Sequence, residues 1–223
     1  MEALIFDMDG LMIDSERLYF DTEREMARRF KKTVEEETLW KMMGRSPLES
    51  MAVFVETLKL PLSPKEVLGK RNELMRVKLK NDLQSMPGLN HILDTFYGKL
   101  KMAVCTGAQK EFLDIVVDGL GIRKKFHALQ TSDGIKHGKP DPEIYLETCT
   151  RLDKKPHQCV VLEDSSNGAL AGKRAGCYVI AVPSEYTREQ DFSFVHYIAA
   201  DLFQAENHIS RFLLSPKNGI GSR

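Results

Sequence analysis

The chain has 223 residues, 42% of them hydrophobic, which is enough to bury one large domain or a core domain with a smaller one. Lysine plus arginine and aspartate plus glutamate both total 32, so no net field favours nucleic acid or an anionic membrane. The start of the chain lacks the features of a signal peptide, and no apolar run approaches the length of a membrane span. We therefore expect a cytoplasmic protein that binds neither nucleic acid nor membrane, with a monomer as the default state.

The first predicted element is a short buried strand over residues 3–6, followed directly by two carboxylates. The apolar run ends at Asp7 and Asp9, and Gly10 supplies the turn that stops the strand. Because open α/β sheets place their ligand crevice at the carboxyl ends of strands, this pair predicts a metal or phosphate site. On its own, however, an Asp-x-Asp-Gly sequence is more often a turn with a capping side chain.

Residues 16–79 predict a small, wholly helical domain inserted after the first strand. Apolar residues recur there at helical spacing, and one such face is expected to carry Leu68, Asn72, Met75 and Leu79. The core domain then consists of residues 1–15 and 80–214. Residues 215–223 are expected to form a flexible tail.

Strands and helices alternate from residue 87 onward. Strands are predicted over residues 101–105, 126–130, 159–162 and 178–182, with helices between them. Strands separated by helices form parallel βαβ units, so the predicted fold class is α/β with a Rossmann-like parallel sheet. One of the helices is expected to have Asp141 as its cap and Pro142 as its first residue.

The four cysteines contain no CxxC pair that would indicate zinc binding or redox chemistry. Cys105 and Cys159 fall in predicted strands, and Cys149 falls in a predicted helix. We therefore expect reduced thiols with a structural role.

Polar residues stand at the ends of three predicted strands, which parallel packing brings to one edge of the sheet. These residues are Asp7 and Asp9, then Thr106 with Gly107, then Glu163 with Asp164. Lys139, in a loop between strands, can reach the same edge. Several ionised carboxylates share a crevice only when a cation offsets their repulsion, and oxygen ligands without His or Cys suit Mg²⁺. A hydroxyl, a glycine N–H and an ammonium group match three phosphoryl oxygens.

Each motif also has an ordinary structural interpretation. Thr106-Gly107 is typical of a helix cap or turn, Glu163-Asp164 can cap the next helix, and a lone lysine such as Lys139 is usually solvated. Their common position at strand ends favours the chemical interpretation. A carboxylate aimed at phosphorus would form an aspartyl-phosphate, and Asp9 could then protonate the leaving oxygen and activate water.

In order and spacing, these motifs resemble those of the haloacid dehalogenase-like superfamily, over nearly the whole chain up to about residue 210. The resemblance implies that Asp7 is the nucleophile and a metal ligand. It implies that Asp9 is the general acid/base and a ligand through its backbone carbonyl. The segment over residues 16–79 is similar to the four-helix cap of this family, which closes over the substrate and sets specificity.

The same resemblance implies roles for the later motifs. Asp164 would be a further ligand of Mg²⁺, and Glu163 would contact the metal directly or through water. Thr106, Gly107 and Lys139 would hold the phosphoryl group. Candidate substrate contacts in the cap are Tyr19, Arg45 and Ser46, although core packing is an equally good interpretation of Tyr19.

The overall pattern is most similar to β-phosphoglucomutases and allied phosphatases, including those acting on pseudouridine 5′-phosphate. The dehalogenase branch does not keep the second aspartate, so Asp9 disfavours that activity. Mutases of this group carry a His at the position of Tyr19 and basic residues at about Met43 and Pro47, and this chain has none of the three. A mutase must exclude water from the aspartyl-phosphate, so these departures favour hydrolysis.

The resulting expectation is a Mg²⁺-dependent phosphomonoesterase that hydrolyses a small phosphorylated metabolite, such as a sugar, nucleoside or polyol phosphate. Two alternatives stay open. One is a phosphoglucomutase-type enzyme, in which Arg45 partly replaces the missing basic residues. The other is a non-catalytic protein of this fold that binds a phosphorylated ligand.

Overall fold

The computed structural model describes residues 1–43 and 45–214, without the side chains of residues 212–214. The predicted flexible tail over residues 215–223 lies outside the described residues. Within the described part of the chain, parallel strands form one six-stranded sheet in the order β3-β2-β1-β4-β5-β6. The strands are β1 (Ala3–Phe6), β2 (Lys101–Cys105), β3 (Ala128–Gln130), β4 (Cys159–Glu163), β5 (Tyr178–Ala181) and β6 (Tyr197–Ile198).

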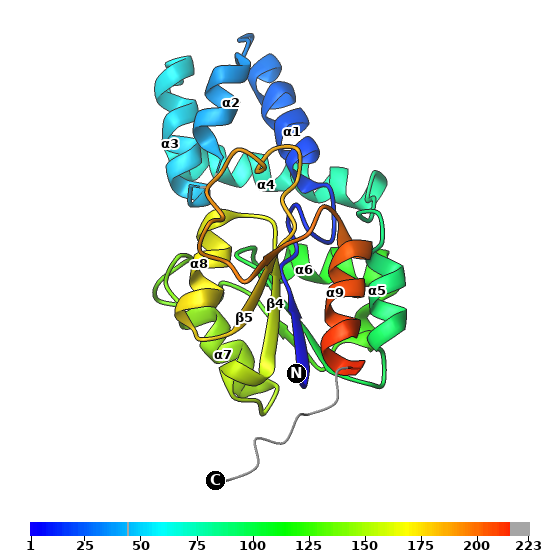
Figure 1. Ribbon diagram of the computed structural model, residues 1–223. Coiled ribbons are helices and arrows are strands. Elements are labelled where there is room, and N and C mark those ends of the chain that lie inside the picture. The colour runs from blue at the N-terminus through cyan, green and yellow to red at the C-terminus, as the bar shows by residue number, and fades with distance from the viewer. Residues whose placement is uncertain (44, 215–223) are drawn as a thin grey trace, which may run out of the picture.

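Helices cover both faces of the sheet, which explains why its strands are continuous apolar runs. On one face, Leu4 and Phe6 of β1 pack in a hydrophobic cluster that includes residues of the three helices covering that face. On the other face, Ala3 and Ile5 pack in a second cluster with two helices. Figure 1 shows α5 and α9 on one side and α7 and α8 on the other. The helices are α5 (Leu89–Phe96), α6 (Lys110–Gly119) and α9 (Leu202–Leu214) for the first cluster, and α7 (Glu143–Arg151) and α8 (Ser166–Arg174) for the second.

The strand order places β1 at the centre of the site. Phe6 lies in register with Val104 of β2 on one side and with Leu162 of β4 on the other. The backbone N–H of Asp7 continues the ladder by donating to the carbonyl of Leu162 at 3.0 Å. The residues that follow β1, β2 and β4 therefore meet at one edge of the sheet, as predicted.

In the described part of the chain, four helices between β1 and α5 form what we call the helical insertion. They are α1 (Ser15–Arg29), α2 (Glu36–Met42), α3 (Pro47–Leu58) and α4 (Pro64–Asn81). The insertion has its own hydrophobic cluster, which includes Met26, Leu39 and Phe54. Figure 1 shows the insertion stacked on the end of the core where the candidate site lies. The division of the chain into a core and a cap stays a prediction.

The α/β fold class is confirmed, and the differences from the predicted elements are local. Helix α7 begins at Glu143 instead of Pro142, and the Asp141 side chain accepts a hydrogen bond from the N–H of Glu143 at 2.9 Å. The two-residue strand β6 was not predicted. All four cysteines are buried free thiols. No helix among the described residues is long and apolar enough to cross a membrane.

Candidate active site

Lys139 lies at the centre of the candidate site, between two buried carboxylates. Its ammonium nitrogen donates to Asp7 Oδ1 at 2.5 Å and to Glu163 Oε1 at 2.6 Å. Burial opposes ionisation of the ammonium, but the two carboxylates raise the pKa of Lys139 well above its ordinary value. Lys139 therefore stays positively charged and holds its charge next to Asp7.

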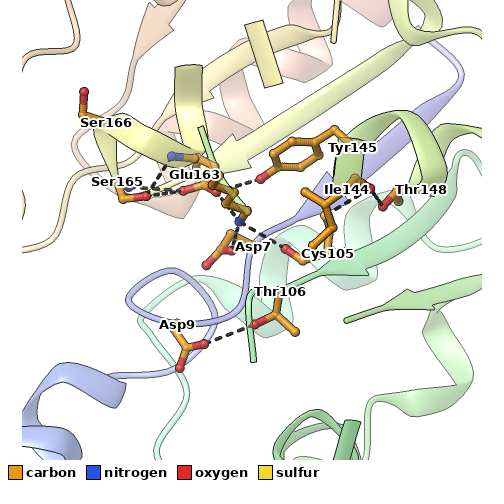
Figure 2. Close-up of polar contacts among 12 residues, drawn as sticks. Asp7, Asp9, Cys105, Thr106, Ile144, Tyr145, Thr148, Glu163, Ser165 and Ser166 are labelled. Carbon is orange, nitrogen blue, oxygen red and sulfur yellow. Dashed lines mark hydrogen bonds and ion pairs between the residues drawn. The ribbon is translucent and has the colours of Figure 1, made fainter. Parts of the chain in front are cut away.

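Glu163 is completely buried, and hydrogen bonds occupy both of its oxygens. Oε1 accepts from Lys139 and from the hydroxyl of Tyr145, the latter at 2.7 Å. Oε2 accepts from the backbone N–H of Ser165 at 3.2 Å and from its hydroxyl at 3.0 Å. Figure 2 shows Tyr145 and Ser165 on opposite sides of Glu163. Four donors thus fix this carboxylate beside the lysine.

The neighbouring helix passes Glu163 at a distance that only glycine permits. A Cβ atom on Gly168 of α8 would lie 1.8 Å from Glu163 Oε1. A second close approach occurs at Gly10, which has a φ of +75° and where a Cβ atom would lie 2.3 Å from Asp164 Oδ2. Glu163, the last residue of β4, and Asp164, which follows it, are therefore each packed closely against a glycine.

Asp9 and Asp7 have different surroundings, although only one residue separates them. Thr106 donates to Asp9 Oδ2 at 3.2 Å and accepts from the N–H of Ala108 at 3.0 Å (Figure 2). Burial raises the pKa of Asp9, and hydrogen bonds from Ser15 and Thr106 oppose this rise. Asp7 has the ammonium group as its direct partner, whereas Asp9 has hydroxyl groups. Because burial raises the pKa of both carboxyl groups, the two aspartates are distinguished by their partners, a cation for Asp7 and a neutral hydroxyl for Asp9.

Three carboxylates offer oxygens that could hold a metal ion. Atoms of Asp7, Glu163 and Asp164 lie within 4.8 Å of one another, and all three residues are buried. Burial raises the pKa of Asp164 well above its usual value, and the nearby charges of Glu16, Glu163 and Asp7 raise it further. Burial also raises the pKa of Asp7, against the effect of Lys139. Buried carboxylates that repel one another in this way form an oxygen donor set suited to a hard divalent cation.

A buried arginine of the insertion, Arg71, was not predicted as a site residue from the sequence. The guanidinium of Arg71 lies 5.0 Å from the ring centre of Tyr19, and its positive charge lowers the pKa of Asp9 against the larger effect of burial. Its hydrogen bonds go to the side-chain oxygen of Asn72, and Glu23 is buried nearby. Burial raises the pKa of Glu23 to about 7 against the effect of Arg71.

The expected buried face of α4 was right at Met75 and Leu79 but one residue off in its first two turns, where Arg71 lies. The buried residues of this helix are Val67, Arg71, Met75 and Leu79, at a spacing of four. The expected face instead began at Leu68 and included Asn72. A charged residue in an otherwise apolar stripe is the sequence signal that marks Arg71.

The other two cap candidates are exposed and are engaged at helix ends. The Arg45 guanidinium donates to the carbonyl of Lys41 at 2.8 Å, and Ser46 caps α3 in a reciprocal pair with Glu49. Among the described contacts, neither side chain reaches the carboxylates of the site. Gly107 is exposed at the end of β2, and a side chain there would meet nothing within 4 Å.

A family model described as haloacid dehalogenase-like hydrolase matches residues 4–182. The chain belongs to this family. The match covers β1 to the end of β5, and so includes every element that supplies a core residue of the site. The predicted family and fold are thereby confirmed.

Named relatives of this haloacid dehalogenase-like hydrolase are phosphatases. The chain is 35% identical to the phosphorylated carbohydrates phosphatase of Thermotoga maritima over 178 residues, which cover 79% of this chain and 82% of the relative. It is 28% identical to the fructose-1-phosphate phosphatase YqaB of Escherichia coli, over 81% of this chain and 95% of the relative. The expected enzyme class, a phosphatase of this family, is confirmed.

A solved structure from the same family also matches. The putative β-phosphoglucomutase of Thermotoga maritima superposes with a TM-score of 0.81 at 28% identity, covering 95% of this chain and 99% of that one. The likeness extends over both the core and the helical insertion. This structural similarity therefore does not distinguish a phosphatase from a mutase.

Proposed function

We propose that this chain hydrolyses the phosphate monoester of a small metabolite, such as a sugar, nucleoside or polyol phosphate, through an aspartyl-phosphate on Asp7. The observation that carries the proposal is the placement of Asp7 against Lys139 and of Asp9 against Thr106, two residues apart on one loop. A protein that only binds phosphate needs a positive charge such as that of Lys139 and a hydroxyl such as that of Thr106. It has no need for two carboxylates in separate environments.

In the first step, an Asp7 oxygen attacks phosphorus, the ester P–O bond breaks, and Asp9 donates its proton to the leaving oxygen. In the second step, Asp9 takes a proton from water, the water oxygen attacks phosphorus, and the bond between phosphorus and Asp7 breaks. Lys139 and Thr106 hold the phosphoryl oxygens, together with the N–H of Gly107. Each aspartate returns to its starting protonation state.

The proposed cofactor is Mg²⁺, held by the side chains of Asp7 and Asp164 and by the backbone carbonyl of Asp9. When bound, it would offset the repulsion between these carboxylates and stabilise charge on the phosphoryl oxygens. We assign Glu163 a positioning role beside it, because four donors already occupy its two oxygens. Its function would be to hold Lys139 at the phosphoryl site.

The helical insertion is proposed to act as the cap, with Arg71, Tyr19 and Glu23 in contact with the substrate. Arg71 is only 7% exposed, and its hydrogen bonds go to Asn72, so its charge is not paired directly with a carboxylate among the described residues. A buried guanidinium favours a substrate with several hydroxyl groups or a second anionic group. This observation keeps the mutase alternative open, since a mutase must bind a second phosphate.

The test of the proposed function is phosphate release from a panel of sugar, nucleoside and polyol phosphates with Mg²⁺. We expect hydrolysis of at least one ester, complete loss with EDTA, and recovery when Mg²⁺ is restored, because the buried carboxylates need a cation. Conversion of β-glucose 1-phosphate to glucose 6-phosphate without phosphate release would instead establish the mutase. If the chain binds metal but hydrolyses no ester of the panel, the result would support the alternative of a non-catalytic protein that binds a phosphorylated ligand.

Replacing Arg71 by Ala is expected to raise KM for the best ester of the panel by roughly 10- to 100-fold, the value of a hydrogen bond to a charged group. The effect on p-nitrophenyl phosphate should be much smaller, because that ester offers no hydroxyl groups to the cap. Arg28→Ala, at an exposed position of α1, is the matched control, and it should leave KM unchanged for both esters. An equal rise in KM for the two esters in Arg71→Ala would show that Arg71 does not determine substrate specificity.

A further inference from the structure

An aromatic cluster joins the helical insertion to the core. We call it the aromatic bridge: Phe20 of α1, Trp40 of α2, and Tyr186 from the loop after β5. The ring centres of Tyr186 lie 5.6 Å from Phe20 and 5.8 Å from Trp40, and Phe20 and Trp40 are 5.7 Å apart. Tyr186 packs on the hydrophobic cluster of the insertion although it belongs to the core. Figure 1 shows this loop, in orange, reaching the helices of the insertion.

The turn that carries Tyr186 is anchored at the candidate active site. Thr187 is 3% exposed, and its hydroxyl lies 3.5 Å from Asp164 Oδ2. Its oxygen also accepts from the N–H of Ser184 at 2.9 Å, and the Ser184 hydroxyl accepts from the N–H of Tyr186 at 3.3 Å. Two consecutive residues of one hydrogen-bonded turn therefore contact a candidate metal ligand and the insertion.

The covalent links alone do not fix the insertion over this edge. The chain leaves the core after Ile13 and returns at Ser85, so two adjacent segments form the whole connection. Non-covalent contacts across the interface must therefore set how often the insertion lies over Asp7 and Asp9. The aromatic bridge provides such a contact, because the ring of Tyr186 covers Phe20 and Trp40 only while the insertion rests on the core.

We propose that Tyr186 is a positioning residue that holds the helical insertion over the active site through its ring contacts with Phe20 and Trp40. The kinetic part of this inference rests on the proposed function, and the spectroscopic part does not. Each aromatic pair adds modestly to stability, so the loss of two pairs shifts the balance between the seated and the displaced insertion by roughly 10-fold.

The chain contains a single tryptophan, so the fluorescence of Trp40 reports on the bridge directly. Trp40 is 47% exposed with Tyr186 in place. In Tyr186→Ala we expect its emission to shift to longer wavelength and its quenching by acrylamide to increase. Tyr186→Phe keeps the ring and should behave as wild type. Tyr97→Ala removes an exposed tyrosine outside the bridge and is the matched control.

The same variants are assayed with p-nitrophenyl phosphate and Mg²⁺. Tyr186→Ala and Tyr186→Leu should lower kcat/KM by about tenfold, and Tyr186→Phe should restore it. Trp40→Leu leaves the contact between Tyr186 and Phe20, so it should give a smaller loss. The double variant Tyr186→Leu/Trp40→Leu should lose little more than Tyr186→Leu alone, because Tyr186→Leu already removes the contact with Trp40. Melting temperatures establish that each variant is folded, and Tyr186→Leu keeps apolar volume at the position if the alanine variant is unstable.

Two results would overturn the proposal. One is unchanged Trp40 emission and quenching in folded Tyr186→Ala or Tyr186→Leu. The other is an equal loss of kcat/KM in the phenylalanine and alanine variants, which would show that the ring contacts do not matter. If the wild-type chain hydrolyses no ester, the proposed function fails while the fluorescence measurements still decide the positioning role.

Discussion

Asp7→Asn is expected to lower phosphate-ester hydrolysis by about 10⁴-fold or more, the scale on which removal of a catalytic nucleophile acts. The amide keeps the shape of the side chain but cannot form the acyl-phosphate bond, and it leaves Lys139 without one of its two carboxylate partners. The measurement is kcat for p-nitrophenyl phosphate, and for the best ester of the panel, with Mg²⁺. The phosphate-release panel first establishes which esters the wild-type chain hydrolyses.

The control for this change is Asp118→Asn. Asp118 forms an ion pair with Arg123 on the exposed surface of α6, outside the site. Its loss removes a negative charge of the same kind, but activity should stay at the wild-type level, since surface ion pairs contribute little. Turnover by Asp7→Asn within a few-fold of wild type would refute the aspartyl-phosphate mechanism.

Gly168→Ala is expected to damage both stability and catalysis. The added methyl group would overlap the Glu163 carboxylate, which is completely buried and held by four donors. Moving this carboxylate disturbs a buried charge pair, so the free energy of unfolding should fall by about 3 kcal/mol. For a chain of this length, that loss lowers the melting temperature by roughly 10 °C. Lys139 would be displaced as well, and kcat should fall by about 10²-fold.

Gly69→Ala is the matched control, because Gly69 lies on α4 and a Cβ atom there would meet nothing within 4 Å. Alanine is the better helix former, so this variant should gain about 1 kcal/mol in stability without a change in kcat. A Gly168→Ala enzyme with the melting temperature and kcat of wild type would contradict the role given to the Glu163 carboxylate.

Much of the core was predictable, because its signals are local. Buried parallel strands are short apolar runs, and the residue after each run must lie at the carboxyl edge of the sheet. The sequence therefore predicted that Asp7, Thr106 and Glu163 would come together. The contact of Lys139 with this edge followed from its place in a loop between strands, although its two carboxylate partners did not.

The features that escaped prediction depend on tertiary contacts. Arg71 was missed because the buried face of α4 is set by the helices packed against it, and a shift of one residue changes the side chains that face the core. Strand β6 has only two residues, too few for a periodic pattern. Tyr186 contacts Phe20 and Trp40 from far along the chain, and no local pattern reports such a pairing.

The joint between the helical insertion and the core is narrow, and this has a consequence for protein engineering. Ile13 and Ser85 form an antiparallel bridge, and the N–H of Met86 donates to the carbonyl of Met12 at 2.9 Å. Antiparallel neighbours of this kind can be joined by a two-residue hairpin turn. We therefore expect that the residues between them can be exchanged for the corresponding segment of a relative with β1 left in place, provided that apolar residues replace Leu18, Met75 and Leu79, which pack in the hydrophobic cluster of β1.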